Sequence, residues 1–284
     1  TGPTITQPLC YGETGAIDIG VTGGVGPYIY LWTGDLGGTA ITITPDNTQD
    51  ISNLAPGDYT VVVTDDNGCT ATQTWTINEA PPAIVLTPTI TQPLCHNGTG
   101  SATIGINGGV PGYTISIDGG APVVVATNPH PINPLSPGIH TVTVLDANGC
   151  EEEIQITINN PPAILLGVVG TDVPCHGGNN GVLVITASGG TGLLTYTVSS
   201  ITGGLPIFAG PISSGTTVTV TGSGAAPMPA GTYTVTITDA NLCTATQTVI
   251  IGEPTLLQIT GPTITQPLCY GETGAIDIGV TGGV

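Results

Sequence analysis

The residue type best suited to chemistry in this sequence is cysteine, of which there are seven. Six of them occur as an early and a late member of three similar stretches, so the pattern predicts one disulfide inside each stretch. The predicted pairs are Cys10 with Cys69, Cys95 with Cys150, and Cys175 with Cys243, and the partner of Cys269 is expected beyond the end of this chain. In the loop-entropy model, closing a loop of this length stabilises the fold by roughly 4 kcal/mol. Zinc binding is the weaker alternative, because no Cys-x-x-Cys spacing or paired His accompanies the cysteines.

Catalytic chemistry has little support in the sequence. None of the four histidines stands in a Ser/His/Asp or His-x-x-Glu arrangement: His96, His130, His140 and His176. We therefore expect no enzyme, with no catalytic, cofactor-binding or metal-binding residues. His96 and His176 directly follow a cysteine, and we interpret them as half-exposed turn residues, with metal ligation as the alternative.

The acidic side chains raise the question of calcium, which prefers carboxylate oxygens. Candidates are the pair Asp65-Asp66 and the run Glu151-Glu152-Glu153, but no Asp-x-Asp-x-Asp-Gly loop is present. Asp65, Asp146 and Asp239 instead recur at a turn, where an aspartate caps backbone N–H groups. We assign these three a structural role, expect no cofactor, and keep calcium as an alternative.

Three aromatic residues close together could form a sugar-stacking platform: Tyr28, Tyr30 and Trp32. Strand alternation places all three on one face. That arrangement is more typical of a core, so we predict that they are buried.

The chain is organised as a tandem repeat. A Gly turn leads to an aromatic ring, then to an alternating Thr/Val strand, Asp-x-Asn and a cysteine; the rings are Tyr59, His140 and Tyr233, each ten residues before its late cysteine. Upstream, each early cysteine is followed 13 or 14 residues later by a Gly-Gly pair. Thr260 to Val284 repeats Thr1 to Val25 letter for letter. Three diverged modules therefore form one long unit, followed by the start of the next.

These repeats define four predicted segments. Module 1 covers residues 1–80 and lacks the lead into its first strand; module 2 covers 81–160, module 3 covers 161–253, and 254–284 begins an incomplete module. The modules are joined by short proline-containing segments such as Asn78-Glu79-Ala80-Pro81-Pro82. Proline stiffens such a junction, so we expect a semi-rigid array with few residues free to hinge.

The local patterns predict an all-β fold. Ile17, Ile19 and Val21 alternate with smaller or polar residues, as a strand with one buried face does. About seven short strands per module, with turns every 8 to 12 residues, favour tandem immunoglobulin-like β-sandwiches joined end to end. Tyr59 and its counterparts fit a tyrosine corner, in which a ring hydroxyl bonds the backbone; His140 would use a ring nitrogen. Leu242 replaces the turn glycine of modules 1 and 2, so we expect that turn to differ.

Charge excludes several partners. The chain has no Lys or Arg against 19 Asp and Glu, a formal charge of −19. Nucleic acid is excluded because phosphate binding needs cations, and so is a polybasic membrane anchor. Since no run reaches 18 apolar residues, we also expect no membrane insertion.

With these motifs in hand, the sequence resembles the SprB-type repeat of Bacteroidota cell-surface adhesins. The shared elements are Cys-x-Gly early, Gly-Gly before Pro-Tyr in the middle, and Gly-x-Tyr-x-Val-x-Val-x-Asp-x-Asn-Gly-Cys late; module 1 carries them best, through Cys10, Gly12, Gly23, Gly24, Pro27, Tyr28, Tyr59, Asp65, Asn67, Gly68 and Cys69. The resemblance implies very long extracellular proteins exported by type IX secretion, which form surface filaments for gliding motility and attachment. It brings no catalytic residues.

The expected function is therefore structural: a stalk segment of a giant surface adhesin, located outside the bacterial cell. One alternative is an adhesive module that itself binds polysaccharide or another cell. A second is a filament subunit that exchanges strands between chains. The expected partners are neighbouring repeats of the same protein, with surface polysaccharide or other filament chains under the alternatives.

Overall fold

The computed structural model describes residues 2–36, 39–42, 49–201, 206–222 and 227–283. Thr1 and Val284, which bound the repeated segments, lie outside this set. The described residues form 23 β-strands and contain no helix. Accordingly, this part of the chain has no helix able to span a membrane.

Each module consists of two antiparallel sheets built from seven strands. In module 1, one sheet has the order β1-β2-β5 and the other β4-β3-β6-β7. The strands are β1 (Thr4–Thr6), β2 (Gly15–Asp18), β3 (Ile29–Leu36), β4 (Thr39–Thr42), β5 (Ile51–Leu54), β6 (Gly57–Thr64) and β7 (Thr70–Ile77).

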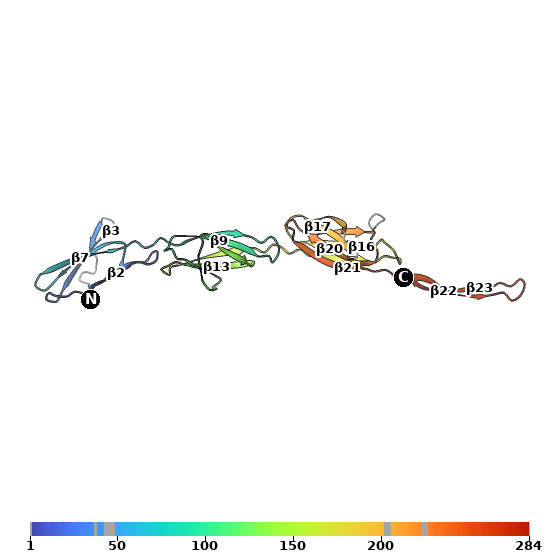
Figure 1. Cartoon of the computed structure of the whole chain (residues 1–284), viewed down its shortest axis with the longest axis horizontal. Helices are drawn as coiled ribbons and strands as arrows, with labels where there is room; N and C mark the ends of the chain where they lie inside the picture. The colour runs from blue at the N-terminus through green and yellow to red at the C-terminus, as the bar shows by residue number, and fades with distance from the viewer. Residues whose placement is uncertain (1, 37–38, 43–48, 202–205, 223–226, 284) are drawn as a thin grey trace. The chain divides into compact units, whose positions relative to one another are not determined.

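Modules 2 and 3 repeat this plan (Figure 1). Module 2 has sheets β12-β9-β8 and β11-β10-β13-β14, with β8 (Val85–Thr91), β9 (Gly100–Asn107), β10 (Thr114–Ile117), β11 (Val123–Val124), β12 (His130–Leu135), β13 (Gly138–Leu145) and β14 (Glu151–Ile158). Module 3 has sheets β15-β16-β19 and β18-β17-β20-β21, with β15 (Leu165–Thr171), β16 (Val182–Ser188), β17 (Leu194–Ser200), β18 (Pro206–Ile212), β19 (Thr216–Thr221), β20 (Gly231–Thr238) and β21 (Thr244–Ile251).

The core of each module lies between its two sheets. In module 2, one buried cluster contains Ile104 of β9, Ile115 of β10 and Val142 of β13, so it draws on both sheets. Along β13 buried and half-buried residues alternate, because successive side chains of a strand point to opposite faces. The predicted all-β, immunoglobulin-like sandwich fold is thereby confirmed.

The predicted corner rings occupy equivalent places in the three cores. The hydroxyl of Tyr59 donates to the carbonyl oxygen of Ala55 at 2.8 Å, and that of Tyr233 donates to Pro229 O at 2.7 Å. His140 replaces the hydroxyl with its Nε2, which lies 2.8 Å from Ser136 O. All three rings thus bond the carbonyl four residues upstream.

In modules 2 and 3 the first glycine of the Gly-Gly pair is required by close contact with another segment of backbone. In module 2 a Cβ on Gly108 would lie 1.9 Å from the carbonyl oxygen of Ala83, and in module 3 Gly189 has the same relation to Ala163. The segment leading into the first strand therefore crosses directly over the glycine. In module 1, Gly23 has open space, and β1 has three residues where β8 and β15 have seven.

The chain divides into two compact units. The first comprises Thr1–Thr91 with Gly100–Ile158, and the second comprises Gln92–Thr99 with Asn159–Val284. The segment Gln92–Thr99, which carries the early cysteine of module 2, therefore belongs with module 3.

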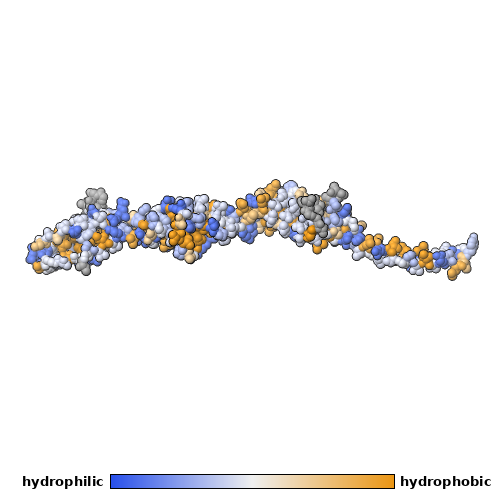
Figure 2. All heavy atoms as spheres, in the orientation of Figure 1, coloured by the Kyte–Doolittle hydropathy of each residue, from blue (hydrophilic) through white to orange (hydrophobic). Residues whose placement is uncertain are grey.

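The chain closes with a separate hairpin of β22 (Thr255–Thr265) and β23 (Ala275–Gly283). These strands form a two-stranded sheet of their own (Figure 1). Every residue of β22 is exposed, including several large apolar ones. Figure 2 shows these hydrophobic side chains along the hairpin.

Candidate functional site: the disulfide junctions

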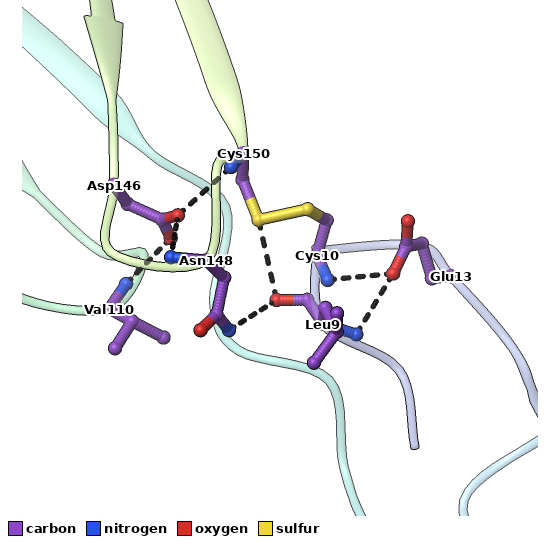
Figure 3. The surroundings of a disulfide bond; sticks show 7 residues. All are labelled: Leu9, Cys10, Glu13, Val110, Asp146, Asn148 and Cys150. Atoms are coloured by element: carbon purple, nitrogen blue, oxygen red, sulfur yellow. Dashed lines mark hydrogen bonds between the residues drawn. A yellow bond between two sulfur atoms is a disulfide. The ribbon is translucent and has the colours of Figure 1, made fainter. Parts of the chain in front are cut away.

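The disulfides join an early cysteine to the late cysteine of the next module. Cys10 is bonded to Cys150 and Cys95 to Cys243, with Cα atoms 5.5 and 5.6 Å apart (Figure 3). Cys69, Cys175 and Cys269 are exposed and have no disulfide partner among the described residues. The predicted pairs within modules, Cys10 with Cys69, Cys95 with Cys150 and Cys175 with Cys243, are therefore wrong.

The geometry of a module explains this correction. In module 3 the loop carrying Cys175 precedes Gly181, whose Cβ position meets Ile251 at one end of β21, whereas Cys243 precedes the other end of that strand. Eight residues of strand place these ends roughly 25 Å apart. A disulfide instead requires Cα atoms within about 7 Å. The two cysteines of one module therefore lie at opposite ends of it.

An aspartate organises the late loop, which is the turn that carries the late cysteine of a module. Asp146 Oδ1 accepts hydrogen bonds from the backbone N–H of Asn148 (2.8 Å) and Cys150 (2.9 Å), and Oδ2 accepts one from Val110 (2.8 Å). Gly149 ends the turn with φ +84° and donates to the carbonyl oxygen of Asp146. The carboxylate thus fixes the cysteine and links the loop to the segment after the Gly-Gly pair.

The same loop occurs in the other modules. Asp65 and Asp239 each cap two N–H groups of their own loop through Oδ1, at 2.8–3.0 Å. Leu242 adopts φ +67° where the other loops have glycine, and it donates the same hydrogen bond to its aspartate. The expectation that this turn differs is therefore wrong, because leucine takes the left-handed conformation that the loop requires.

The early loop of module 1, which carries the early cysteine Cys10, provides a hydrogen-bond acceptor for the late loop of module 2. Glu13 Oε2 accepts hydrogen bonds from the N–H of Leu9 and of Cys10, both at 2.9 Å (Figure 3). The carbonyl oxygen of Leu9 accepts a hydrogen bond from Asn148 Nδ2 at 2.9 Å. Cys150 Sγ lies 3.3 Å from the same oxygen; this is a contact and not a hydrogen bond, because a disulfide sulfur carries no proton.

The second junction repeats these contacts. Asn241 Nδ2 donates to the carbonyl oxygen of Leu94 at 3.1 Å beside the Cys95–Cys243 bond. Here the early loop also holds the connecting segment, since His96 Nδ1 lies 2.8 Å from Pro161 O. Asn97 N–H donates to Asn160 Oδ1 at 2.9 Å. His96, interpreted from sequence as a turn residue, therefore binds the linker to the next module.

The early loop of module 3 is preformed although its cysteine is unpaired. His176 Nδ1 lies 3.2 Å from Pro254 O, and Gly177 N–H donates to Glu253 Oε2 at 2.7 Å. The loop closes through a hydrogen bond from Gly178 N–H to Cys175 O. Linker binding thus does not depend on the disulfide.

One set of linker contacts was missed by the sequence reasoning. The residue three positions before each early cysteine accepts a backbone hydrogen bond from the linker: Gln7 from Asn78, Gln92 from Asn159, and Asp172 from Gly252, at 2.8, 2.7 and 2.6 Å. Their constant spacing from the cysteine was the signal that could have revealed them.

The electrostatics of the loops follow from these hydrogen bonds. Burial raises the pKa of Asp146, but the backbone hydrogen bonds from Val110, Cys150, Asn148 and Gly149 together outweigh burial, and the net pKa is lowered. Backbone hydrogen bonds from Cys10 and Leu9 likewise lower the pKa of Glu13. Both side chains are therefore held as carboxylates, the form that accepts these bonds.

The remaining candidate sites from the sequence are the aromatic platform and the possible metal ligands. Trp32 is buried in the module 1 core, against which Tyr28 and Tyr30 pack, so these rings form no exposed platform. Among the described residues, no three His, Cys, Asp or Glu side chains gather closely enough to hold a metal ion. The absence of a cofactor and of enzyme activity stays a prediction.

Fold and junctions together define a tandem array of immunoglobulin-like modules with disulfides between successive modules. The SprB repeat model matches three ranges of the chain: residues 2–37, 87–122 and 168–203. Three SprB repeats therefore occur across the chain, one in each module. Each matched range holds the early cysteine and the Gly-Gly pair of its module.

Other comparisons add little. The search of curated proteins found no match. Among solved structures, the three N-terminal domains of the Hoc capsid protein of bacteriophage RB49 share 13% identity, cover 89% of this chain and 98% of their own, and give a TM-score of 0.36. A Ca²⁺-stabilised adhesin with which an Antarctic bacterium binds ice shares 15% identity, with coverages of 89% and 74% and a TM-score of 0.35. Nothing further follows from similarities of this size.

Proposed function

We propose that this chain is an extracellular, non-enzymatic spacer: a stalk segment of a repetitive surface adhesin that provides length and resists extension. The observation that carries the proposal is the pair of disulfides that join the early loops of modules 1 and 2 to the late loops of modules 2 and 3. SprB repeats support an adhesin, and disulfides are typical of proteins outside the cytoplasm. Export by type IX secretion and a part in gliding belong to the same proposal.

The junctions suit a chain under tension. At each junction the disulfide runs in parallel with a peptide linker that is itself held by hydrogen bonds, such as the bond from Asn159 N–H to Gln92 Oε1. If the linker is pulled away, the sulfur bond still holds the two modules. Load then passes from Cys10 to Cys150, through module 2 to Cys95, and on to Cys243.

This path shortens the chain that force can extend. Between Cys10 and Cys243 the peptide has 243 − 10 = 233 residue steps, but the route through both disulfides has only 150 − 95 = 55. At about 3.5 Å per extended residue, these correspond to roughly 800 and 190 Å. The disulfides therefore limit lengthening even when the modules unfold.

Single-molecule force spectroscopy tests the proposal. The full chain is stretched from its ends with and without reductant, and the oxidised chain is expected to extend about 600 Å less. A variant with Cys69→Ser and Cys175→Ser keeps both bonds and should behave like the oxidised parent. Equal extension of the oxidised and reduced chains would contradict the mechanical role. Tight, saturable binding of surface polysaccharide by the oxidised chain would also contradict it.

A further inference from the structure

The atom that docks the first junction, the one closed by Cys10–Cys150, belongs to a side-chain amide. Asn148 Nδ2 donates to the carbonyl oxygen of Leu9 at 2.9 Å beside the disulfide (Figure 3). When a side-chain amide is hydrolysed, its nitrogen leaves as ammonia and a carboxylate remains. Hydrolysis at Asn148 therefore removes the donor that holds the early loop of module 1.

The residue after Asn148 favours this reaction. Deamidation of an asparagine begins when the backbone nitrogen of the next residue attacks the side-chain carbon Cγ, and a side chain on that next residue obstructs the attack. Gly149 has no side chain, the space around its Cβ position is open, and both residues are exposed to water. In the second junction, closed by Cys95–Cys243, the side chain of Leu242 obstructs the attack on Asn241. The two docking asparagines thus make the same contact but differ in reactivity.

Hydrogen bonds hold both reacting groups while the first junction is intact. The amide of Asn148 is fixed through Nδ2 by the Leu9 carbonyl oxygen. The backbone N–H of Gly149, which has to lose its proton before it can attack, donates to the carbonyl oxygen of Asp146 at 3.1 Å. The attack therefore requires the side chain of Asn148 to leave Leu9 and the turn to open.

The late loop of module 1 has the same turn without the docking bond. Asn67 N–H donates to Asp65 Oδ1 at 3.0 Å, and Gly68 N–H donates to Asp65 O at 2.9 Å, as the equivalent groups do in module 2. The Asn67 side chain has no hydrogen bond to another residue in the part of the chain that the structure describes. Asn67 therefore provides a reference for the reactivity of this turn without docking.

We propose that Asn148 is a deamidation site that the intact junction protects and that opening of the Cys10–Cys150 bond by a thiol exposes. Both products of the reaction, aspartate and isoaspartate, lack Nδ2 and carry carboxylate oxygens that repel the carbonyl oxygen of Leu9. The docking contact does not form again when the cysteines are reoxidised, so one opening permanently weakens the first junction. The second junction, in which Leu242 protects Asn241, recovers fully. The proposal does not depend on the mechanical role.

The reaction consumes water and the thiol that opens the disulfide. Two thiols transfer two electrons and two protons to the S–S bond and leave as a disulfide. Hydroxide removes the proton from Gly149 N, this nitrogen bonds to Asn148 Cγ, and the bond from Cγ to Nδ2 breaks. Ammonia leaves with a proton from water, which regenerates the hydroxide. Water then opens the resulting five-membered imide at one of its two carbonyl carbons, which gives aspartate or isoaspartate.

The experiment incubates the full chain in heavy-oxygen water at mildly alkaline pH, with and without a thiol reductant, and maps its peptides by mass spectrometry. Heavy oxygen in the new carboxylate identifies conversion that occurs during the incubation. Asn148 is expected to convert about 2- to 13-fold faster in the reduced chain, because one hydrogen bond changes an opening equilibrium by about this factor. Asn67 should convert at the same rate in both chains. Equal rates for Asn148 in the oxidised and reduced chains overturn the proposal.

Two matched variants test the role of the residue that follows the asparagine. Gly149→Leu gives module 2 the turn of module 3, where Leu242 already adopts φ +67°. It should abolish the conversion of Asn148 in the reduced chain, while both disulfides still form. Leu242→Gly should make Asn241 convert in the reduced chain as Asn148 does in the parent. Conversion of Asn148 at the parent rate in the first variant, or continued resistance of Asn241 in the second, overturns the proposal.

Reoxidation tests whether the change is permanent. The chain that was reduced and incubated is transferred to glutathione buffers, and thiol mapping compares its two junctions. The equilibrium of Cys10–Cys150 should lie about 2- to 13-fold further toward reduction than before, since the docking hydrogen bond is lost. Cys95–Cys243 should return to its initial equilibrium. Full recovery of both junctions despite conversion of Asn148 overturns the proposal.

Discussion

Asn148 donates a hydrogen bond of 2.9 Å to the carbonyl oxygen of Leu9, which lies 139 residues earlier in the chain. Asn241 makes the equivalent bond to Leu94 at 3.1 Å across 147 residues. In both junctions the asparagine stands two residues before the bonded cysteine and its acceptor stands one residue before the other cysteine. The Asn-x-Cys element of the repeat therefore docks the preceding early loop and aligns the sulfur.

Removing this amide should weaken the disulfide next to it. For Asn148→Ala we expect the equilibrium between Cys10–Cys150 and glutathione to shift toward reduction about 2- to 13-fold, because a hydrogen bond of this kind contributes about 0.5–1.5 kcal/mol. Quantitative thiol mapping in glutathione buffers measures the shift. Asn67→Ala alters the same position in module 1 and should leave both bonds unaffected; equal effects of the two variants would contradict the docking role.

Removing the carboxylate of the late loop should destabilise module 2. Asp146→Ala leaves the N–H groups of Val110, Asn148 and Cys150 without their acceptor. We expect a loss of at least about 2 kcal/mol in the free energy of opening, since unsatisfied donors cost about 1–3 kcal/mol each. Hydrogen exchange of the β13 and β14 amides measures it. Glu152→Ala removes the same charge from an exposed site and should change little; a comparable loss there would point to charge and not to capping.

The stability of module 2 should depend on pH near neutrality. The hydrogen bond with Ser136 O and the one with the Asp118 carboxylate raise the pKa of His140, and the bond from His140 lowers the pKa of Asp118. Because its folded pKa is raised, His140 stabilises the folded module fully at pH values below its unfolded pKa of about 6.5. This stabilisation is lost as the pH rises through the folded pKa. Because its folded pKa is lowered, Asp118 stabilises the folded module at pH values above its unfolded pKa of about 3.9. This stabilisation is lost as the pH falls through the folded pKa.

Module 2 should therefore be less stable at pH 8 than at pH 6, and His140→Tyr, the residue of modules 1 and 3, should remove most of that difference. Amide hydrogen exchange of β13 at both pH values measures it, with an NMR titration of the His140 ring as a direct check. A parent chain whose module 2 has equal stability at the two pH values would contradict the pairing.

The crossing of the lead segment over the Gly-Gly pair can be tested with alanine. Gly108→Ala places a methyl group on the Ala83 carbonyl oxygen and should destabilise module 2 by about 2–4 kcal/mol, from left-handed backbone strain and overpacking together. Gly23→Ala changes the same position in module 1, where φ is +82° and space is open, and should show only the strain of about 1–2 kcal/mol. Local hydrogen exchange in β9 and β2 compares them. Equal effects would mean that strain alone explains the glycines.

The strands and rings could be predicted from the sequence because they depend on local patterns. Alternation identified the buried face that includes Ile17, and a fixed spacing identified Tyr59 and its counterparts. The disulfides could not be predicted in the same way. Pairing within a module and pairing shifted by one module both join one early to one late cysteine, so the repeat pattern fits each equally well.

The choice between them depends on which ends of the sandwich the two loops occupy, which is a property of strand length and not of cysteine spacing. The linker contacts of Gln7 and Gln92 were missed for a related reason, since their partners become neighbours only when the module closes. A glycine in the sequence is not needed to identify this turn, because Leu242 also adopts the left-handed conformation where Asp239 caps the loop.

The shifted bonds also affect what a cut in the backbone can do. The spans closed by Cys10–Cys150 and Cys95–Cys243 overlap, so every peptide bond between residues 10 and 243 lies inside at least one covalent ring. A protease that cuts the chain once anywhere in that interval leaves the two pieces covalently joined, and between Cys95 and Cys150 two rings join them. Whether a cut chain stays in one piece then depends on keeping its sulfurs oxidised more than on keeping every amide intact.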